Sequence, residues 1–250
     1  MVKKNNIKDK KLKKILIFIP AYNVEKKIFK TVRDIPKNVF KKNKISILII
    51  NDNSKDKTSS EIQKIKKYFK HKIYVLNNKK NLGYGGVQKK AYRFAILKKF
   101  NFVIMLHGDG QHTPKKIPNF INMLKNINYD AVLGTRMWSY RSAIKGGMPK
   151  YKFVANILLT KFQNLLLGSK MSEFHSGYRS YKVNSLKKIK FNNYSNNFHF
   201  DTEIIIGLLL KKMKIKEIPI PTIYKDEESH LKSIPYGLNI LFVTIRAKFK

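Results

Sequence analysis

Four polar, turn-rich segments in the first half of the sequence hold the residues best suited to chemistry. They are residues 20–23 (Pro-Ala-Tyr-Asn), 51–54 (Asn-Asp-Asn-Ser), 81–86 (Asn-Leu-Gly-Tyr-Gly-Gly) and 107–112 (His-Gly-Asp-Gly-Gln-His). Each follows a continuous apolar run, which predicts a strand buried on both faces of a parallel sheet. Because such loops converge at one edge of an open parallel sheet, polar atoms from all four should line one crevice.

The last of these segments predicts a metal site. Asp109 and Gln111 are two residues apart and supply the oxygen ligands that Mg²⁺ or Mn²⁺ prefers. His107 precedes Asp109 by two residues and could add a nitrogen, which Mn²⁺ accepts more readily than Mg²⁺. A divalent ion at this place would neutralise a diphosphate leaving group.

The glycine-rich segment argues against two common nucleotide-binding classes. No Gly-Lys-Ser/Thr follows it, and no G-x-G-x-x-G comes directly after the first apolar run, so neither a P-loop ATPase nor a classical dehydrogenase is indicated. Gly83, Gly85 and Gly86 would instead let the backbone approach a ligand closely.

The elements that must position these loops alternate between strand and helix patterns, which predicts a doubly wound α/β sheet. Strands are expected at 15–19, 45–50, 73–76, 102–106 and, more weakly, 131–133. Helices are expected at 25–35, 58–69, 87–97 and 114–124. The second half predicts helices at 151–167 and 202–213, a loop at 174–181 and a strand at 215–218. A C-terminal helix at 234–249 could either pack on the core or lie in a membrane interface.

Composition limits the remaining possibilities. The 53 Lys and Arg against 15 Asp and Glu give a net charge of +38, yet 43% hydrophobic residues exclude a disordered basic tail. The absence of Cys excludes disulfides, thiolate metal sites and a Cys nucleophile. Basic residues are dispersed rather than clustered, so a nucleic-acid-binding module is only a distant alternative and no nucleic-acid partner is expected. No apolar run approaches the roughly 20 residues that span a bilayer.

The chain resembles the family 2 glycosyltransferases of GT-A fold, in particular those that make dolichyl- or polyprenyl-phosphate sugars. Segment 20–23 looks like the opening motif of the family, 51–54 like its D-D-G-S motif, and 81–86 like its N-x-G-x-G-G loop. Segment 107–111 sits at the D-x-D-x-Q metal motif, 134–136 looks like G-S-R, and 176–179 looks like S-G-F-R. The chain departs from the family at His107, which replaces the first metal Asp, and at Asn51 and Asn53, which replace an Asp and a Gly.

The resemblance implies a Rossmann-like GT-A fold, with a mostly parallel sheet flanked by helices and further helices on the C-terminal, acceptor side. It covers one catalytic domain at 15–236, with a donor half at about 15–136 and an acceptor half at about 137–236. A basic tail at 1–14 and an amphipathic helix at 237–250 flank that domain.

The resemblance also implies roles for individual residues. The metal, Mg²⁺ or Mn²⁺, would be held by Asp109, Gln111 and His107. Arg136, Arg179 and Ser176 would bind the acceptor or a phosphate, and the two Arg could grip either the lipid phosphate or the donor diphosphate. Nucleotide-sugar binding would fall to Pro20, Tyr22, Asn23, Glu25, Asn51, Asp52, Ser54, Asn81, Gly83, Gly86, Gly108 and Asp109.

The implied reaction is inverting transfer of a hexose from a UDP- or GDP-sugar to a polyprenyl or dolichyl phosphate. The enzyme would be cytoplasmic and peripheral on the inner, anionic face of the membrane, where a basic surface can hold it. The alternative is a saccharide hydroxyl acceptor, as in cell-envelope polysaccharide or glycan synthesis, and this acceptor would need a general base. Asp201 and Glu203 are the candidate catalytic bases, although Asp201 could equally cap a helix.

Overall fold

The computed structural model describes residues 12–224 and 233–249. Most of the tail predicted at 1–14, residues 225–232 of the predicted catalytic domain and Lys250 of the predicted C-terminal helix therefore lie outside the described residues. The strands are β1 (Lys14–Ala21), β2 (Lys44–Asn51), β3 (Ile73–Asn77), β4 (Phe102–Met105), β5 (Ala131–Thr135), β6 (Arg179–Lys182) and β7 (Ile215–Pro219). The helices are α1 (Ile28–Arg33), α2 (Lys37–Lys42), α3 (Thr58–Tyr68), α4 (Gly83–Leu97), α5 (Ile117–Lys125), α6 (Tyr140–Lys145), α7 (Lys150–Leu167), α8 (Val183–Leu186), α9 (Phe200–Leu210) and α10 (Ser233–Lys248).

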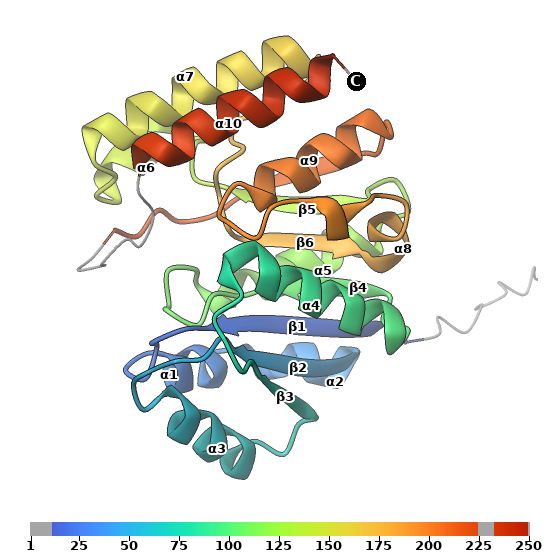
Figure 1. The fold of residues 1–250 in the computed structure, drawn as a ribbon. Coiled ribbons are helices and arrows are strands. Elements are labelled where there is room, and N and C mark those ends of the chain that lie inside the picture. The colour runs from blue at the N-terminus through green and yellow to red at the C-terminus, as the bar shows by residue number, and fades with distance from the viewer. Residues whose placement is uncertain (1–11, 225–232, 250) are drawn as a thin grey trace, which may run out of the picture.

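A seven-stranded sheet in the order β3-β2-β1-β4-β6-β5-β7 forms the centre of the molecule (Figure 1). Strands β1 to β4 run parallel, as do β5 and β7, so the predicted mostly parallel α/β sheet is confirmed. The six predicted strands are all present, with ends that shift by one or two residues.

The predicted loop at 174–181 is partly wrong, because its last residues begin β6. This strand pairs antiparallel with both β4 and β5 and so joins the two halves of the sheet. Its four residues, Arg-Ser-Tyr-Lys, form no apolar run, and the hydroxyl of Ser180 donates to the carbonyl of Val132 at 2.9 Å. Long-range pairing, rather than a local pattern, therefore forms this strand.

Side chains of the strands alternate between two hydrophobic clusters, one on each face of the sheet. In β1, Ile15, Ile17 and Ile19 pack with helices α1, α3 and α5, while Leu16 and Phe18 pack with α4, α8 and α9. Burial on both faces explains why the strands read as continuous apolar runs. It also leaves only the strand ends free to build a site.

Helices α7 and α10 form an outer layer beyond α9, at the end of the molecule farthest from β3 (Figure 1). The prediction of a helix over 151–167 is confirmed, and Gly168 ends it with a left-handed φ of 62°. Helix α10 begins four residues before the boundary predicted at 237. Within residues 12–224 and 233–249, no helix has both the length and the apolar character needed to cross a bilayer.

The segment after β7 runs close to the end of α6 and depends on a glycine there. The backbone N–H of Tyr224 donates to the carbonyl of Gly146 at 3.0 Å. A Cβ on Gly146 would lie 2.3 Å from the carbonyl oxygen of Thr222, which is too close for any real contact. Only glycine at position 146 therefore leaves room for the backbone of Thr222.

Gly146→Ala should lower the free energy of unfolding by about 1–3 kcal/mol, because the added methyl group must displace backbone. Urea denaturation measures the change. Gly237→Ala is the matched control: its Cβ would meet nothing within 4 Å, so the stability should stay equal or rise. Equal effects of the two substitutions would contradict the packing described here.

Candidate active site

The loops at the carboxyl ends of the first four strands meet at a cavity of about 570 Å³. This volume lies in the range of small-molecule sites. Residues from all four predicted segments line it, as the sequence indicates. The predicted site residues among them are Pro20, Tyr22, Asp52, Asn81, Gly83, His107, Gly108, Asp109, Gln111, Arg136, Arg179 and Asp201.

Asp52 shapes the glycine-rich loop at one end of the cavity. One carboxylate oxygen accepts hydrogen bonds from the backbone N–H of Leu82 at 2.8 Å and from the amide of Asn78 at 2.7 Å. The other accepts from the backbone N–H of Gly83 at 3.1 Å. Gly83 has a φ of +76°, a left-handed backbone conformation that residues other than glycine rarely adopt. The hydrogen bonds of Asp52 therefore hold the first residue of α4 in this conformation.

Five of the predicted donor-site residues do not line the cavity: Asn23, Glu25, Asn51, Ser54 and Gly86. Most of them connect the first two loops. Asn23 accepts a hydrogen bond from the backbone of Lys55 at 2.8 Å, and the hydroxyl of Ser54 accepts one from the backbone of Asn23 at 3.0 Å. Their contacts hold the loops in register with each other.

Asp109 presents a half-buried carboxylate to the cavity. One oxygen accepts from the backbone N–H of Gln111 at 2.9 Å, and the other lies 3.9 Å from Nδ1 of His107. Burial opposes ionisation of Asp109, but the hydrogen bond and charge of His107 outweigh it and lower the pKa to about 2. Burial likewise opposes protonation of His107, and Asp109 more than offsets it, so the pKa of His107 is raised. The two groups therefore favour each other's charged form.

These residues fit a divalent ion that is shared with a ligand. No cluster of three or more His, Cys, Asp or Glu suited to a metal occurs among the described residues. Mg²⁺ commonly binds one or two carboxylates together with substrate phosphates and water. Asp109 can supply that carboxylate, with Gln111 as a neighbouring oxygen donor.

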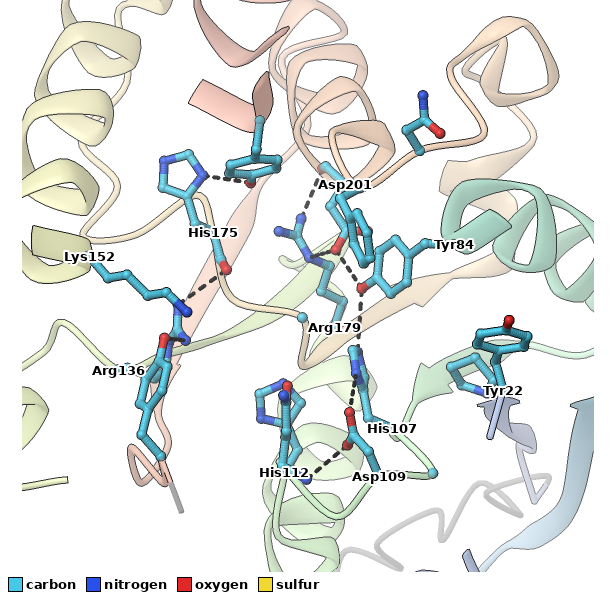
Figure 2. A pocket seen from close by; sticks show the side chains of 18 of the residues that line it. Tyr22, Tyr84, His107, Asp109, His112, Arg136, Lys152, His175, Arg179 and Asp201 are labelled. Carbon is cyan, nitrogen blue, oxygen red and sulfur yellow. Dashed lines mark hydrogen bonds and ion pairs between the residues drawn. The ribbon is translucent and has the colours of Figure 1, made fainter. Parts of the chain in front are cut away.

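A buried network around Asp201 closes the centre of the site, as Figure 2 shows. One oxygen of Asp201 lies 3.1 Å from Nε of Arg179 and accepts from the hydroxyl of Tyr84 at 2.8 Å. Its other oxygen accepts from the amide of Gln88 at 2.8 Å. The Tyr84 oxygen also lies 3.3 Å from Nε2 of His107, which links this network to the Asp109 corner.

The guanidinium of Arg179 is 1% exposed and binds backbone as well as Asp201. It donates to the carbonyls of Ser176 at 2.7 Å, Phe174 at 2.6 Å and Asp201 at 2.9 Å. Ser176 is buried and does not line the cavity. Arg179 thus holds the segment before β6 and the start of α9 in place.

Arg136 lies at the opposite end of the cavity and is paired with buried Glu173. Its other donors reach the hydroxyl of Tyr224 at 3.0 Å and the carbonyl of His175 at 3.2 Å. Burial lowers the pKa of His175 to about 3, so this ring is neutral. Nδ1 of His175 lies 2.9 Å from the hydroxyl of Tyr236 on α10.

Sequence reasoning missed Lys152, Tyr84 and Gln88. Lys152 comes from α7 and lines the cavity next to Arg136, with Nζ 5.5 Å from the centre of the Tyr224 ring (Figure 2). Arg136 and Arg179 each form an ion pair, whereas Lys152 forms none with the residues that the structure describes. Nothing in the sequence marks Lys152 as a cavity residue, because Lys is abundant throughout the chain. Tyr84 lies inside the glycine-rich segment, and Gln88 is a polar residue in an otherwise apolar helix pattern.

Glu203 lies outside the cavity. Its carboxylate accepts from the backbone N–H of Ser195 at 2.6 Å, so it stabilises the turn before α9. Asp201 lines the cavity, but both of its oxygens are engaged by protein groups.

Comparison with known proteins gives a consistent set of relatives. Residues 16–190 match the sequence profile of glycosyl transferase family 2. An uncharacterized protein of Methanocaldococcus jannaschii is 31% identical over 251 residues, covering 99% of this chain and 98% of the relative. The UDP-N-acetylglucosamine–dolichyl-phosphate N-acetylglucosaminyltransferase of Methanococcus voltae is 28% identical, covering 92% of this chain and 91% of the relative.

Among solved structures, glucosyl-3-phosphoglycerate synthase from Mycobacterium tuberculosis is similar in fold. Its complex with Mn²⁺, UDP and glucosyl-3-phosphoglycerate superposes with a TM-score of 0.66 at 13% identity, over 94% of this chain and 80% of that one. The predicted GT-A fold is thereby confirmed.

Arg179→Met should lower the free energy of unfolding by about 3–5 kcal/mol, because it leaves the Asp201 carboxylate buried without its cation. The double variant Arg179→Met/Asp201→Asn should lose less than the sum of the two single variants, by about 0.5–3 kcal/mol. Denaturant titration of all four proteins measures the coupling. Strict additivity would show that the two side chains do not stabilise each other.

Proposed function

The chain belongs to glycosyl transferase family 2, and from that premise we propose that it transfers a hexose from a nucleotide-diphosphate sugar to a polyprenyl or dolichyl phosphate, with inversion. In this reaction the phosphate oxygen of the lipid attacks the anomeric carbon and the nucleoside diphosphate leaves. The name of the Methanococcus voltae relative supports this class of acceptor and makes UDP-N-acetylglucosamine the first donor to test.

The observation that carries the proposal is that, among the residues described in the structure, the cavity offers no available general base. Of its carboxylates, Asp52 is bonded to the glycine-rich loop, Asp201 to Arg179, Tyr84 and Gln88, and Asp109 has a pKa of about 2. A hydroxyl acceptor must lose its proton during attack and needs such a base. A phosphate monoester, with a second pKa of about 6, is already an anion at neutral pH.

The histidines of the cavity support the same conclusion. Burial lowers the pKa of His112 well below its usual value and that of His175 to about 3. Burial opposes protonation of His107 but Asp109 outweighs it and raises the pKa, and the two ring nitrogens lie against Asp109 and the hydroxyl of Tyr84. A general base works best with a pKa near the working pH, which His112 and His175 do not have, and with a free nitrogen, which His107 does not present.

At the donor end, Asp109 would hold a divalent ion together with the diphosphate of the donor. The ion supplies charge neutralisation as negative charge builds on the leaving diphosphate. The Asp52-shaped loop keeps Gly83 at the cavity wall, and Tyr22, 39% exposed, offers a ring beside it for the nucleoside.

At the acceptor end, Lys152 and Arg136 would receive the lipid phosphate. The same wall carries Met148, Tyr151, Leu159 and Ile223, so cationic and apolar groups lie side by side. A polyprenyl phosphate combines an anion with an apolar chain, and this wall is complementary to both parts.

The proposal predicts a lipid-soluble product. Purified protein with a short-chain, water-soluble polyprenyl phosphate and labelled UDP- and GDP-sugars should transfer label into the solvent-extractable glycosyl phosphate when Mg²⁺ or Mn²⁺ is present. Asp109→Asn should lower the rate at least about 100-fold, since several kcal/mol of charge stabilisation depend on the ion. Glu61→Gln, on the surface of α3, is the matched control and should not change the rate. Label that appears only in saccharide acceptors would exclude the proposal.

Lys152→Ala should raise the KM for the polyprenyl phosphate by about 10- to 100-fold, the effect of losing a hydrogen bond to a charged group. The KM for the donor should stay constant, because Lys152 lies at the other end of the cavity. Lys161→Ala, an exposed position on the same helix, serves as the control. An equal rise in both KM values would contradict the assigned position of the acceptor.

A further inference from the structure

We infer that the outer face formed by α7 and α10 docks on an anionic lipid bilayer, so that the acceptor end of the cavity opens at the membrane surface. The inference rests on the proposed function for the identity of the acceptor. Its evidence comes from side chains outside the cavity.

The burial pattern of helix α7 is the reverse of that of an ordinary surface helix. The residues that it buries are polar, namely Asn156, Thr160 and Gln163. Besides Lys150 and Lys161, the residues that it exposes are apolar, and the large ones, Tyr151, Val154, Leu158 and Leu165, lie at helical spacing. A helix that faces water normally shows the opposite pattern. An apolar outer stripe on a helix with a polar inner one is suited to a non-aqueous neighbour.

Helix α10 adds a second exposed apolar stripe. It buries Ile240, Thr244 and Ala247 toward the rest of the protein. On its outer side, at spacings of three or four residues, it exposes Ile234, Leu238, Phe242 and Ile245, and the exposed Phe249 follows its last residue. Figure 1 shows α7 and α10 packed side by side as the outermost layer. Two neighbouring helices with such stripes form an apolar surface that soluble monomers rarely leave uncovered.

The charges around this surface favour a bilayer over a second copy of the chain. Helices α6, α7 and α10 contain no Asp or Glu. Their basic residues are Arg141, Lys145, Lys150, Lys152, Lys161, Arg246 and Lys248. A two-fold dimer through this face would bring like charges together, because both partners present the same surface. An anionic lipid surface complements these cations and accepts the apolar side chains.

The position of the cavity agrees with this orientation. Tyr151 and Lys152 in the first turn of α7, and Ser233 and Tyr236 in the first turn of α10, line its acceptor end. The exposed stripes begin at these same turns, so the opening is continuous with the apolar surface. A polyprenyl phosphate could then place its phosphate in the cavity while its chain stays in the bilayer.

The test is sedimentation with phosphatidylcholine vesicles that contain phosphatidylglycerol. General attraction of a basic protein is suppressed at about 1 M salt, where the Debye length is about 3 Å. Wild-type protein should still sediment under this condition. The variant Leu158→Ser/Leu238→Ser/Phe242→Ser should lose at least about tenfold in partitioning, because apolar contact is removed while the net charge stays the same.

The matched control is Tyr68→Ser/Leu97→Ser/Ile127→Ser, which removes three comparably exposed apolar side chains on other faces. This control should bind like the wild type. The inference is overturned if both triple variants bind equally well. It is also overturned if the wild type ignores vesicles and forms a dimer that the α7–α10 variant dissociates.

A soluble acceptor separates this inference from the proposed function. Both triple variants should glycosylate the short-chain, water-soluble polyprenyl phosphate at the wild-type rate, since none of the six positions lines the cavity. Vesicle binding without such transfer would contradict the proposed function alone. Transfer without salt-resistant vesicle binding would contradict the docking surface alone.

Discussion

The buried ion pair between Arg179 and Asp201 is the interaction on which the rest of the site depends. Arg179 begins β6, the short antiparallel strand that joins the two halves of the sheet, and Asp201 lies in the first turn of α9. Through Tyr84 and Gln88 the same carboxylate reaches α4, which begins inside the glycine-rich segment. An unpaired charge at this depth would be costly, so the pair requires all three elements to meet. The two ends of the cavity, at Asp52 and at Arg136, therefore keep a defined separation.

This constraint also shapes the chemistry. A carboxylate that neutralises a buried Arg and accepts hydrogen bonds on both oxygens is poorly suited to take a proton from a substrate. The site is left with an anionic corner at Asp109, where a metal and a diphosphate can be shared, and a cationic corner at Lys152 and Arg136. In the proposed reaction the nucleophile arrives already ionised, and the protein mainly places two anionic groups at opposite ends of one cavity.

The basic residues of the chain fall into two groups, and only one of them is informative about function. Most Lys residues are spread over the surface and carry little information about the ligand. On α7 and α10, however, the cations accompany exposed apolar stripes and no carboxylate is present. That combination, together with the polar residues that α7 buries, distinguishes one face of the molecule from the others.

Local sequence determined six of the seven strands, most of the helices and the convergence of four loops. A strand buried on both faces must read as an apolar run, and the polar residues after it must lie at the edge of the sheet. The motifs therefore located Asp52, Asp109 and Gly83 in advance. Only the tertiary structure decided that Arg-Ser-Tyr-Lys forms a strand, that Glu203 stabilises a turn outside the cavity, and that Lys152 lines the cavity beside Arg136. The strand and the position of Lys152 depend on partners far away in the sequence, such as Val132 for Ser180 and Tyr224 for Lys152, and no local pattern encodes such pairings.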